Sequence, residues 1–382
     1  MKQHKILFVD HTAVMGGAEL CLLDLASAYA QTSKVLLFQN GALRDRLEQI
    51  GVEVNIVPAS KTMLELRTSG GLSSLTAIPE LWKIAGYIAQ EAQNYDLILA
   101  NSQKAFVTAA ISTLRGSPPI VWYLHDILTA KHFSKVNRTI AVFLANKFAA
   151  KVIVNSHATG RAFIAAGGKA ELIDVVYNGF DFNKFDRIKI EEAKAVRSQL
   201  GIENAPLVGL FSRLSYWKGQ HILLEAIKEL PQVRAILVGT ALFGEEEYVG
   251  ELKTLSAIPE LEGRVHWLGF RDDIPTLMKA CDIIVHASTE PEPFGRVIVE
   301  GQLAQKPTIA TAAGGALELI EDGKNGCLFP AGDAIALRQS MQKLIEDPTL
   351  AKTLGQQGYA HAKQNFSSTT ILDSFAQALA KI

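Results

Sequence analysis

The densest set of potentially reactive side chains lies between Glu292 and Glu300, a segment that reads Glu-Pro-Phe-Gly-Arg-Val-Ile-Val-Glu. We expect a helix to begin inside this run, where Gly295 lets the backbone come close to a ligand. Amide groups at such a helix start can hold phosphate oxygens. Eight helical residues would rise about 12 Å, so Glu300 could bind a ribose diol while Glu292 reaches a sugar in the same molecule. The alternative is an ordinary helix with two solvated acids.

Two cationic side chains, Arg213 and Lys218, follow directly after the apolar run at 207–211. A strand end, a turn and a helix start would place both cations at the ligand-binding edge of a sheet. There they could stabilise a departing diphosphate, a role that a divalent metal ion fills in other enzymes. A solvated Arg–Lys pair without a ligand is the alternative.

A histidine and an aspartate, His125 and Asp126, follow the apolar run at 120–124. The histidine could contact a sugar or its phosphate, or it could move a proton near neutral pH. Alternatively, Asp126 caps the next helix and His125 is a surface residue. The sequence does not separate these two interpretations.

Two glycine pairs precede helix-length stretches. Gly16 and Gly17 open the first such stretch, where their amide groups could approach a ligand. Gly314 and Gly315 form another loop-to-helix junction, for which both a plain turn and a ligand contact are open.

Short aliphatic and β-branched runs alternate with longer amphipathic stretches along the chain. The predicted strands are 5–9, 35–38, 52–57, 97–99, 120–124, 152–154, 173–177, 207–211, 235–238, 265–268, 283–286 and 308–310. The predicted helices include 18–30, 76–93, 131–149, 219–229, 295–305 and 333–346. Near-continuous apolar strands separated by helices predict parallel sheets covered on both faces. The charged stretch at 182–205 has no strand, so we expect two doubly wound α/β domains that face one interdomain cleft.

Composition narrows the class of protein. The 382 residues include 38 Lys and Arg against 39 Asp and Glu, and this net charge of −1 offers no polycationic surface for nucleic acid. Cys21, Cys281 and Cys327 are far apart and odd in number, so neither a disulfide framework nor a cysteine zinc site is expected. No leader and no membrane-spanning stretch is recognisable. We therefore expect a cytoplasmic protein that is at most peripheral at the inner face of the membrane.

Several enzyme classes lack their motifs here. The first predicted strand is not followed by the G-x-G-x-x-G fingerprint of dinucleotide-binding enzymes. Gly239 and Gly244 have the spacing of a phosphate-binding P-loop, but Glu245 stands where the lysine is needed. Neither H-E-x-x-H nor a D-x-D pair occurs, so we expect no metal ion and no cofactor.

The segment 131–151 carries five basic residues and an apolar stripe. The basic residues are Lys131, Lys135, Arg138, Lys147 and Lys151, and the stripe consists of Phe133, Val136, Ile140, Phe143 and Leu144. Such a helix can lie on a membrane surface. The favoured expectation is that the stripe packs on the N-terminal sheet and the lysines are solvated.

These residues resemble glycosyltransferase family 4, whose members are retaining enzymes of the GT-B fold. The resemblance runs along nearly the whole chain, and the Glu292–Glu300 element with its upstream Arg213 and Lys218 is its most specific part. The other matching segments are Gly16-Gly17, His125-Asp126, Asn155-Ser156, Tyr177–Asp181 with Phe185, Leu268-Gly269-Phe270, and Gly314-Gly315 with Glu318. Tyr177 departs from the family, which usually has proline there, and this touches a turn and not the chemistry.

The resemblance implies a GT-B architecture of two facing Rossmann-like domains. Residues 1–182, with 368–382 crossing back, would bind the acceptor, and residues 183–367 would bind a nucleotide-sugar donor. Transfer would keep the anomeric configuration through same-face attack, without a protein nucleophile and without a metal ion. The donor is expected to be a UDP-sugar. The acceptor would be a hydroxyl group, on a lipid-linked or polysaccharide molecule.

The resemblance also assigns roles to residues. Arg213 and Lys218 would bind the diphosphate, Glu300 the ribose and the backbone near Phe270 the base. Glu292 and the amides of Phe294, Gly295, Arg296 and Val297 would hold the sugar and the β-phosphate. His125 and the amides of Gly16 and Gly17 would complete the site from the first domain.

Two other functions stay open from the sequence. A sugar-nucleotide 2-epimerase shares the two facing domains, although not this set of cations and glutamates, and would convert the donor without an acceptor. A non-catalytic nucleotide-sugar-binding protein would bind without turnover. The oligomeric state is not indicated.

Overall fold

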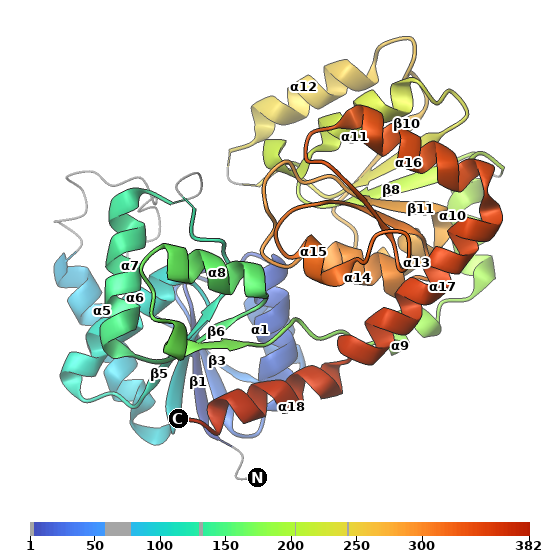
Figure 1. The fold of residues 1–382 in the computed structure, drawn as a ribbon. Helices are drawn as coiled ribbons and strands as arrows, with labels where there is room; N and C mark the ends of the chain where they lie inside the picture. The colour runs from blue at the N-terminus through green and yellow to red at the C-terminus, as the bar shows by residue number, and fades with distance from the viewer. Residues whose placement is uncertain (1–3, 58–77, 130–132, 203, 243) are drawn as a thin grey trace. The chain divides into compact units, whose positions relative to one another are not determined.

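The chain forms two compact units, Met1–Gly179 with Ser368–Ile382, and Phe180–Ser367. The computed structural model describes residues 4–57, 78–129, 133–202, 204–242 and 244–382. Figure 1 shows a parallel sheet with flanking helices in each unit.

The first unit is built on one parallel sheet with the strand order β3-β2-β1-β4-β5-β6-β7. Its strands are β1 Ile6–Asp10, β2 Ser33–Leu37, β3 Glu53–Ile56, β4 Leu97–Ala100, β5 Ile120–Leu124, β6 Ala149–Val154 and β7 Ile173–Val175. Its helices are α1 Gly17–Ala28, α2 Ala42–Gln49, α5 Ile78–Glu91, α6 Gln103–Ser112, α7 Lys135–Phe148, α8 His157–Ala165 and α18 Ser368–Leu379. The order reverses between β1 and β4, the position at which doubly wound sheets bind ligands.

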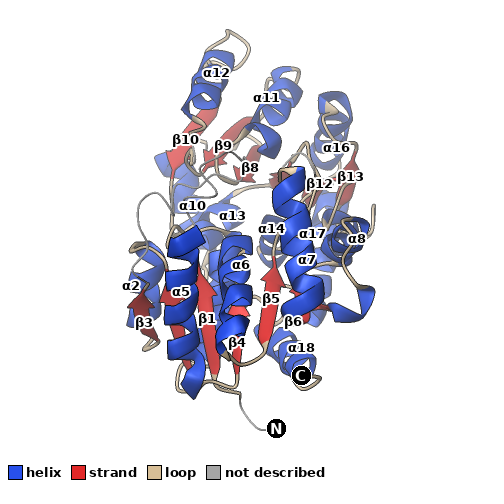
Figure 2. Cartoon of the chain, turned by 90° about the vertical axis from the view of Figure 1, so that its left-hand side faces the viewer, coloured by secondary structure: helices blue, strands red, loops and turns tan. Residues whose placement is uncertain are grey.

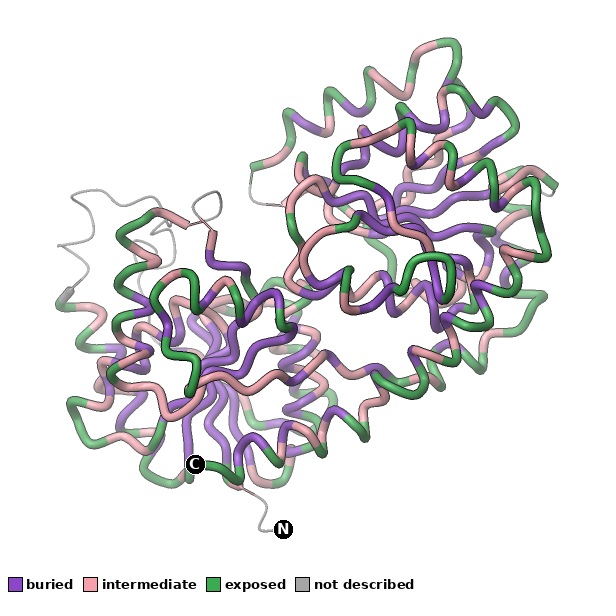
Figure 3. Tube along the Cα trace, viewed as in Figure 1, coloured by how far each residue is buried: buried purple, intermediate pink, exposed green. Residues whose placement is uncertain are grey.

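Alternate residues of β1 reach opposite faces of this sheet because side chains in a strand alternate with a period of two. Leu7 and Val9 belong to the core beneath α5, α6 and α7, and Figure 2 shows these helices in front of the sheet. Ile6 and Phe8 belong to the opposite core, which α1, α2 and α18 cover. Both faces are therefore apolar, and Figure 3 shows that the strands between them are buried.

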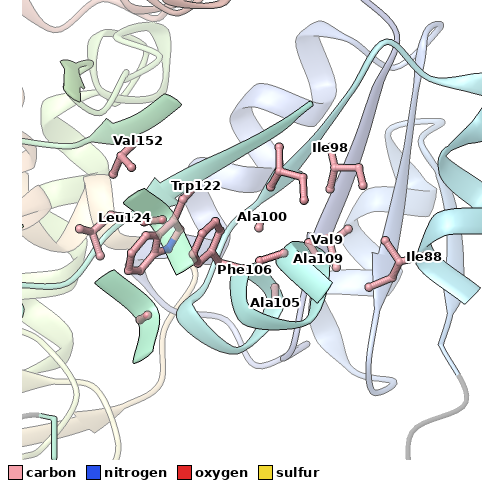
Figure 4. Packing of buried hydrophobic residues seen from close by; sticks show 14 of the residues in the cluster. Val9, Ile88, Ile98, Ala100, Ala105, Phe106, Ala109, Trp122, Leu124 and Val152 are labelled. Carbon is pink, nitrogen blue, oxygen red and sulfur yellow. The ribbon is translucent and has the colours of Figure 1, made fainter. Parts of the chain in front are cut away.

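Aromatic packing fixes the core under α6. The rings of Phe106 on α6 and Trp122 on β5 are stacked, with centroids 4.5 Å apart, and Phe163 on α8 meets Trp122 edge-on at 6.1 Å. Figure 4 shows Trp122 and Phe106 side by side among aliphatic residues. These contacts hold β5, and with it the loop that follows Leu124, against α6 and α8.

The last helix, α18, completes the first unit. Its buried residues, Ile371, Phe375, Ala378 and Leu379, join the core that α1 covers. The ring of Phe375 meets that of Tyr29 edge-on, with centroids 6.0 Å apart. Residues from both ends of the sequence thus share one hydrophobic core.

The second unit contains a six-stranded parallel sheet with the order β10-β9-β8-β11-β12-β13. Its strands are β8 Leu207–Phe211, β9 Arg234–Val238, β10 Val265–Gly269, β11 Ile283–His286, β12 Thr308–Thr311 and β13 Cys327–Phe329. Its helices are α9 Asn183–Asp186, α10 Ile190–Gln199, α11 Gln220–Lys228, α12 Glu246–Ser256, α13 Ile274–Ala280, α14 Arg296–Leu303, α15 Ala316–Leu319, α16 Ala334–Glu346 and α17 Pro348–Asn365. Its order reverses between β8 and β11.

The expected strands are present, and one more was not expected. β13 is a three-residue edge strand beside β12, too short and too near glycine-rich turns to be recognised from the sequence. Two of the expected helices, 76–93 and 131–149, begin in segments that lie partly outside the described residues.

Candidate functional site

An ion pair between Lys218 and Glu292 lies where β8 and β11 end in the second unit. Lys218 closes a short 3-10 turn, Tyr216–Lys218, and Glu292 lies in the loop before α14. The Nζ atom of Lys218 donates to both carboxylate oxygens of Glu292, at 2.6 and 2.7 Å, and each side chain is only 14% exposed. Two residues that were assigned separate roles from the sequence are therefore bonded to each other.

His286 and Ser288 bind the same carboxylate, and the sequence analysis did not identify either of them. The Nε2 atom of His286 lies 3.0 Å from Glu292 Oε2, and the Ser288 hydroxyl donates to that oxygen at 2.8 Å. His286 is the last residue of β11, and Ser288 lies two residues further along the chain. The available signal was these two polar residues at the end of an apolar strand, at the edge where the cations were expected.

Burial and charge act in opposite directions on this carboxylate. Burial alone would raise the pKa of Glu292, but the charge of Lys218 and the hydrogen bond from His286 outweigh it and hold the pKa well below its usual range. Burial lowers the pKa of Lys218, and the charge of Glu292 opposes that shift. The two short hydrogen bonds from Lys218 Nζ to the carboxylate suit an ammonium–carboxylate pair.

Trp217 organises the two expected cations, and the sequence analysis also missed this role. The guanidinium carbon of Arg213 lies 5.5 Å from the centre of the Trp217 ring, and Lys218 Nζ lies 4.0 Å from it. Cations within about 6 Å of an indole face are attracted to it. One aromatic ring thus keeps two like charges close together at the end of β8.

The helix that carries Glu300 begins within one residue of the expected position, but it does not include Glu292. Gly295 caps α14 with φ +97°, in the left-handed region, so the helix starts at Arg296. Only four helical steps, about 6 Å of rise, separate Arg296 from Glu300. The Arg296 Nε atom lies 3.8 Å from Glu300 Oε1. Glu292 stands in the preceding loop, so the predicted 12 Å helical span is wrong.

The remaining expected residues of this unit differ in exposure. Phe294 is 2% exposed, and its ring contacts Phe180 and Phe366, so its side chain belongs to the core. Phe270 follows β10 and is 61% exposed. Val297 is half-buried in the first turn of α14.

Close backbone packing explains the second glycine pair. The Gly315 amide donates to the carbonyl oxygen of Glu292 at 2.8 Å. A Cβ atom on Gly314, whose φ is +61°, would overlap with the Glu292 backbone. Gly314 and Gly315 therefore let this turn press against the loop that carries Glu292.

The first glycine pair lies at the start of α1, where Gly16 is the capping residue and Gly17 the first helical one. The carboxylate of Glu19 folds back over this turn, so that a Cβ atom on Gly16 would lie 2.7 Å from Glu19 Oε2. Burial, followed by the charge of Asp10, raises the pKa of Glu19 to about 8. Hydrogen bonds from the backbone of Glu19 and Gly16 partly oppose that shift.

His125 is held by a specific contact and is not a plain surface residue. Its Nε2 atom lies 2.9 Å from Asn101 Oδ1. Asp126 is exposed, and the next described helix, α7, is capped by Ser134 and not by Asp126. The capping alternative for Asp126 is therefore wrong.

The predicted apolar stripe packs on the core of the first unit only in part. Phe133 and Leu144 are partly buried against that core. Val136, Ile140 and Phe143 are 61%, 45% and 60% exposed, whereas the buried residues of α7 are Ala141, Val142 and Ala145. These three larger residues therefore lie on the outer face of the helix. Lys151 pairs with Asp174 at 3.0 Å, and Lys131 lies outside the described residues.

Within the described residues, no three His, Cys, Asp or Glu side chains gather in a way that could hold a metal ion. None of the described helices has the length and apolar character required to cross a bilayer.

Comparison with known families accounts for both units. The family described as Glycosyltransferase Family 4 matches residues 15–184, and the family described as Glycosyl transferases group 1 matches residues 192–361. The lipopolysaccharide core biosynthesis glycosyltransferase LpsE of Rhizobium meliloti is 32% identical over 177 residues, 46% of this chain and 50% of that protein. Spore coat protein SA of Bacillus subtilis is 30% identical over 220 residues, 54% and 58% of the two chains. The chain thus spans about half the length of these curated relatives.

Solved structures are similar over a greater length. The crystal structure of HepE from Anabaena in complex with UDP and glucose is 46% identical and covers 100% of both chains, with a TM-score of 0.91. A complex of HepE with UDP-glucose gives a TM-score of 0.92 at 45% identity. WaaG, a glycosyltransferase involved in lipopolysaccharide biosynthesis, covers 97% of this chain at 15% identity, which shows a shared fold alone.

Breaking the buried ion pair should cost more than removing it. Glu292→Gln leaves the Lys218 ammonium without its counter-charge and should lower the free energy of unfolding by about 3 to 5 kcal/mol. Lys218→Met with Glu292→Gln should recover part of that loss. Denaturant unfolding measures both, and Lys324→Met with Glu321→Gln, at an exposed pair, should change little. If the loss of unfolding free energy in the double variant equalled the sum of the losses in Glu292→Gln and Lys218→Met alone, the coupling between the two residues would be contradicted.

The raised pKa of Glu19 makes stability depend on pH. Between about 4.5 and 8, native Glu19 keeps a proton that the unfolded chain has released, so its contribution weakens as the pH rises. The slope is about 1.4 kcal/mol per pH unit. Glu19→Gln cannot ionise, so its stability relative to the wild type should increase from pH 5 to 7.5 in urea unfolding. The exposed Glu48→Gln should give a constant difference, and the same constancy for Glu19→Gln would contradict the prediction.

Proposed function

The chain belongs to glycosyltransferase family 4 and has the GT-B fold, and from this premise we propose that it transfers a hexose from a UDP-sugar to an acceptor hydroxyl with retention of configuration. The similarity to HepE, whose crystals contain UDP and glucose or UDP-glucose, supports this donor. The observation that carries the proposal is the buried Lys218–Glu292 pair at the switch point of the second sheet.

Charge at this position suits a diphosphate leaving group. Arg213 and Lys218 would stabilise the negative charge that develops on UDP, so that the reaction needs no metal ion. Because Glu292 already neutralises Lys218, the pair adds little net charge before the donor binds. The diphosphate would then share Lys218 with Glu292 and turn the Glu292 carboxylate toward the sugar hydroxyls.

The other residues would bind the remaining parts of the donor. Glu300 would accept hydrogen bonds from the ribose, and the backbone at Phe270 would contact the base. The amides of Phe294, Gly295, Arg296 and Val297 would hold the β-phosphate. From the first unit, Gly16 and Gly17 would contribute amides and His125 a contact to the sugar.

The proposed reaction breaks one bond and forms one at the anomeric carbon. The bond from that carbon to the β-phosphate oxygen breaks, and the acceptor oxygen bonds to the same face. The acceptor hydroxyl loses its proton to the departing phosphate oxygen, so charge and atoms balance without a protein nucleophile. The acceptor would belong to a polysaccharide or glycolipid, which the description of LpsE supports.

The exposed stripe of α7 supports a peripheral contact with an anionic membrane, at the inner face where a lipid-linked acceptor would lie. Val136, Ile140 and Phe143 form an apolar line on the outer side of the helix, and Lys135 and Lys147 are exposed near its ends. Apolar side chains flanked by lysines suit the interface of a bilayer with acidic headgroups.

If Glu292 contacts the transferred sugar, its loss should affect turnover more than the binding of UDP. Glu292→Gln should lower kcat for transfer from UDP-glucose at least a hundredfold, because the sugar contact is lost in the transition state. The affinity for UDP, measured by calorimetry, should fall less. The exposed Glu321→Gln is the matched control and should keep both. Equal losses of UDP affinity and kcat, or conversion of UDP-glucose without an acceptor, would contradict the proposal.

Metal independence predicts that chelation has no effect. Transfer by the wild type should keep its rate in excess EDTA, because side-chain cations and not a divalent ion would face the diphosphate. Loss of activity in EDTA and its recovery with added magnesium would overturn this part of the proposal. Product stereochemistry, followed by NMR of the anomeric proton, tests retention in the same reaction.

Membrane binding should depend on the apolar stripe. Ile140→Glu with Phe143→Glu should reduce co-sedimentation with phosphatidylglycerol vesicles several-fold, because charge replaces the inserted apolar groups. Ile335→Glu, at a residue of α16 that is 62% exposed, controls for added charge elsewhere. Equal binding of all three proteins, or equal binding to phosphatidylcholine vesicles, would refute the membrane contact.

A further inference from the structure

A continuous chain of hydrogen bonds joins Asp10, Asn101 and His125 in the first unit. The Nδ2 atom of Asn101 donates to Asp10 Oδ2 at 2.6 Å, and Asn101 Oδ1 lies 2.9 Å from His125 Nε2. Asp10 is fully buried and Asn101 is 1% exposed. Of these three residues, only His125 was expected from the sequence to have a role in the site.

Strand register brings these three residues together. Val9 of β1 pairs with Ala100 of β4, so Asp10 and Asn101, each one residue further on, lie side by side. Ala100 also pairs with Trp122 of β5, and His125 follows at the end of that strand. The chain of hydrogen bonds therefore crosses three neighbouring strands at the switch point of the sheet.

The surroundings fix the orientation of the Asn101 amide. Its Nδ2 atom faces two acceptors, the Asp10 carboxylate at 2.6 Å and the carbonyl oxygen of Ala18 at 3.3 Å. Asp10 is a good acceptor because hydrogen bonds from His11, Asn101 and Ser102 and the charge of His11 outweigh burial and lower its pKa. A flipped amide would place Oδ1 against these acceptors. Asn101 Oδ1 must therefore face His125.

That orientation selects one tautomer of the imidazole. Because Asn101 Oδ1 can only accept, His125 Nε2 must carry a proton to donate to it. The Tyr123 ring, with its centroid 4.0 Å from that of His125, packs against the imidazole. In the neutral ring, any hydrogen bond at Nδ1 is then one that the histidine accepts. Such a bond suits a hydroxyl group and not a phosphate.

We propose that Asp10 and Asn101 are positioning residues that hold the His125 ring in its Nε2–H tautomer. The effect of this tautomer on transfer rests on the proposed function. The tautomer itself does not, because the hydrogen bonds within the first unit favour it. An exchange of donor and acceptor on the Asn101 amide would reverse the preference of the ring.

The tautomer can be measured without any assay of activity. In protein labelled with nitrogen-15 histidine, His125, assigned by its loss in His125→Gln, should show a protonated Nε2 and an unprotonated Nδ1 at alkaline pH. Asn101→Ala should give a mixture of tautomers. Asp10→Asn, which lets the Asn101 amide turn over, should also raise the Nδ1–H population. An Nδ1–H ring in the wild type, or an unchanged ring in folded Asn101→Ala, would overturn the inference.

A matched control separates positioning from a general loss of stability. Ser156 caps α8 by accepting from the Thr159 amide, and it is not a member of the Asp10–Asn101–His125 chain. Ser156→Ala should therefore lower stability, as the loss of a helix cap does. It should leave the His125 resonances in the Nε2–H pattern, and a tautomer change there equal to that of Asn101→Ala would overturn the inference.

Kinetics test the consequence for transfer. Asn101→Ala should lower kcat about tenfold, the size expected for one hydrogen bond to the transition state, with little change in KM for the donor. In a His125→Gln background the same substitution should cause no further loss, whereas additive losses would refute action through His125. If the wild type transfers no sugar, the proposed function fails, and the NMR result still decides the tautomer.

Discussion

Lys218 and Glu292 have to be paired within the chain because neither charge has enough water around it to be stable alone. Each side chain is 14% exposed, and the carboxylate gains further hydrogen bonds from His286 and Ser288. Burial of an ion pair is tolerated only with such complete satisfaction. The 3-10 turn before α11 and the loop before α14 therefore depend on each other, since each holds the charge that the other needs.

Both sheets have a buried carboxylate where the strand order reverses, and different donors satisfy it in the two units. In the second unit, a cation and an anion meet directly at the point where the strand order reverses. In the first unit, the buried anion Asp10 at the corresponding reversal is satisfied by an amide and by the His11 backbone. In both arrangements each carboxylate oxygen has a donor within reach. Oriented polar groups at a switch point suit a nucleotide-sugar enzyme, which must orient its substrate closely.

Much of this fold could be predicted from the sequence because buried parallel strands leave a continuous apolar signal. The edge strand β13 was not predicted, because three residues beside a turn are too few to show a hydrophobic pattern. The cations and acids of the second unit could also be named, but their pairing could not, because it depends on how the turn that ends at Lys218 and the loop before α14 meet in space. Asn101 and His286 were missed for a similar reason, since only strand register shows what they touch. The prediction for the stripe failed at Val136, Ile140 and Phe143, because Ala141, Val142 and Ala145 form the buried face of α7.

The return of α18 to the first unit has a consequence for the order of events at the ribosome. The residues beside α1 that pack against Phe375 are synthesised early, but α18, which carries Phe375, is synthesised only after β8 to α17. During translation, the first unit therefore keeps an uncovered apolar surface while the second unit folds around its own sheet. Nascent chains stalled before residue 368 should thus be the species that most need chaperone protection, although the whole second sheet has already been made.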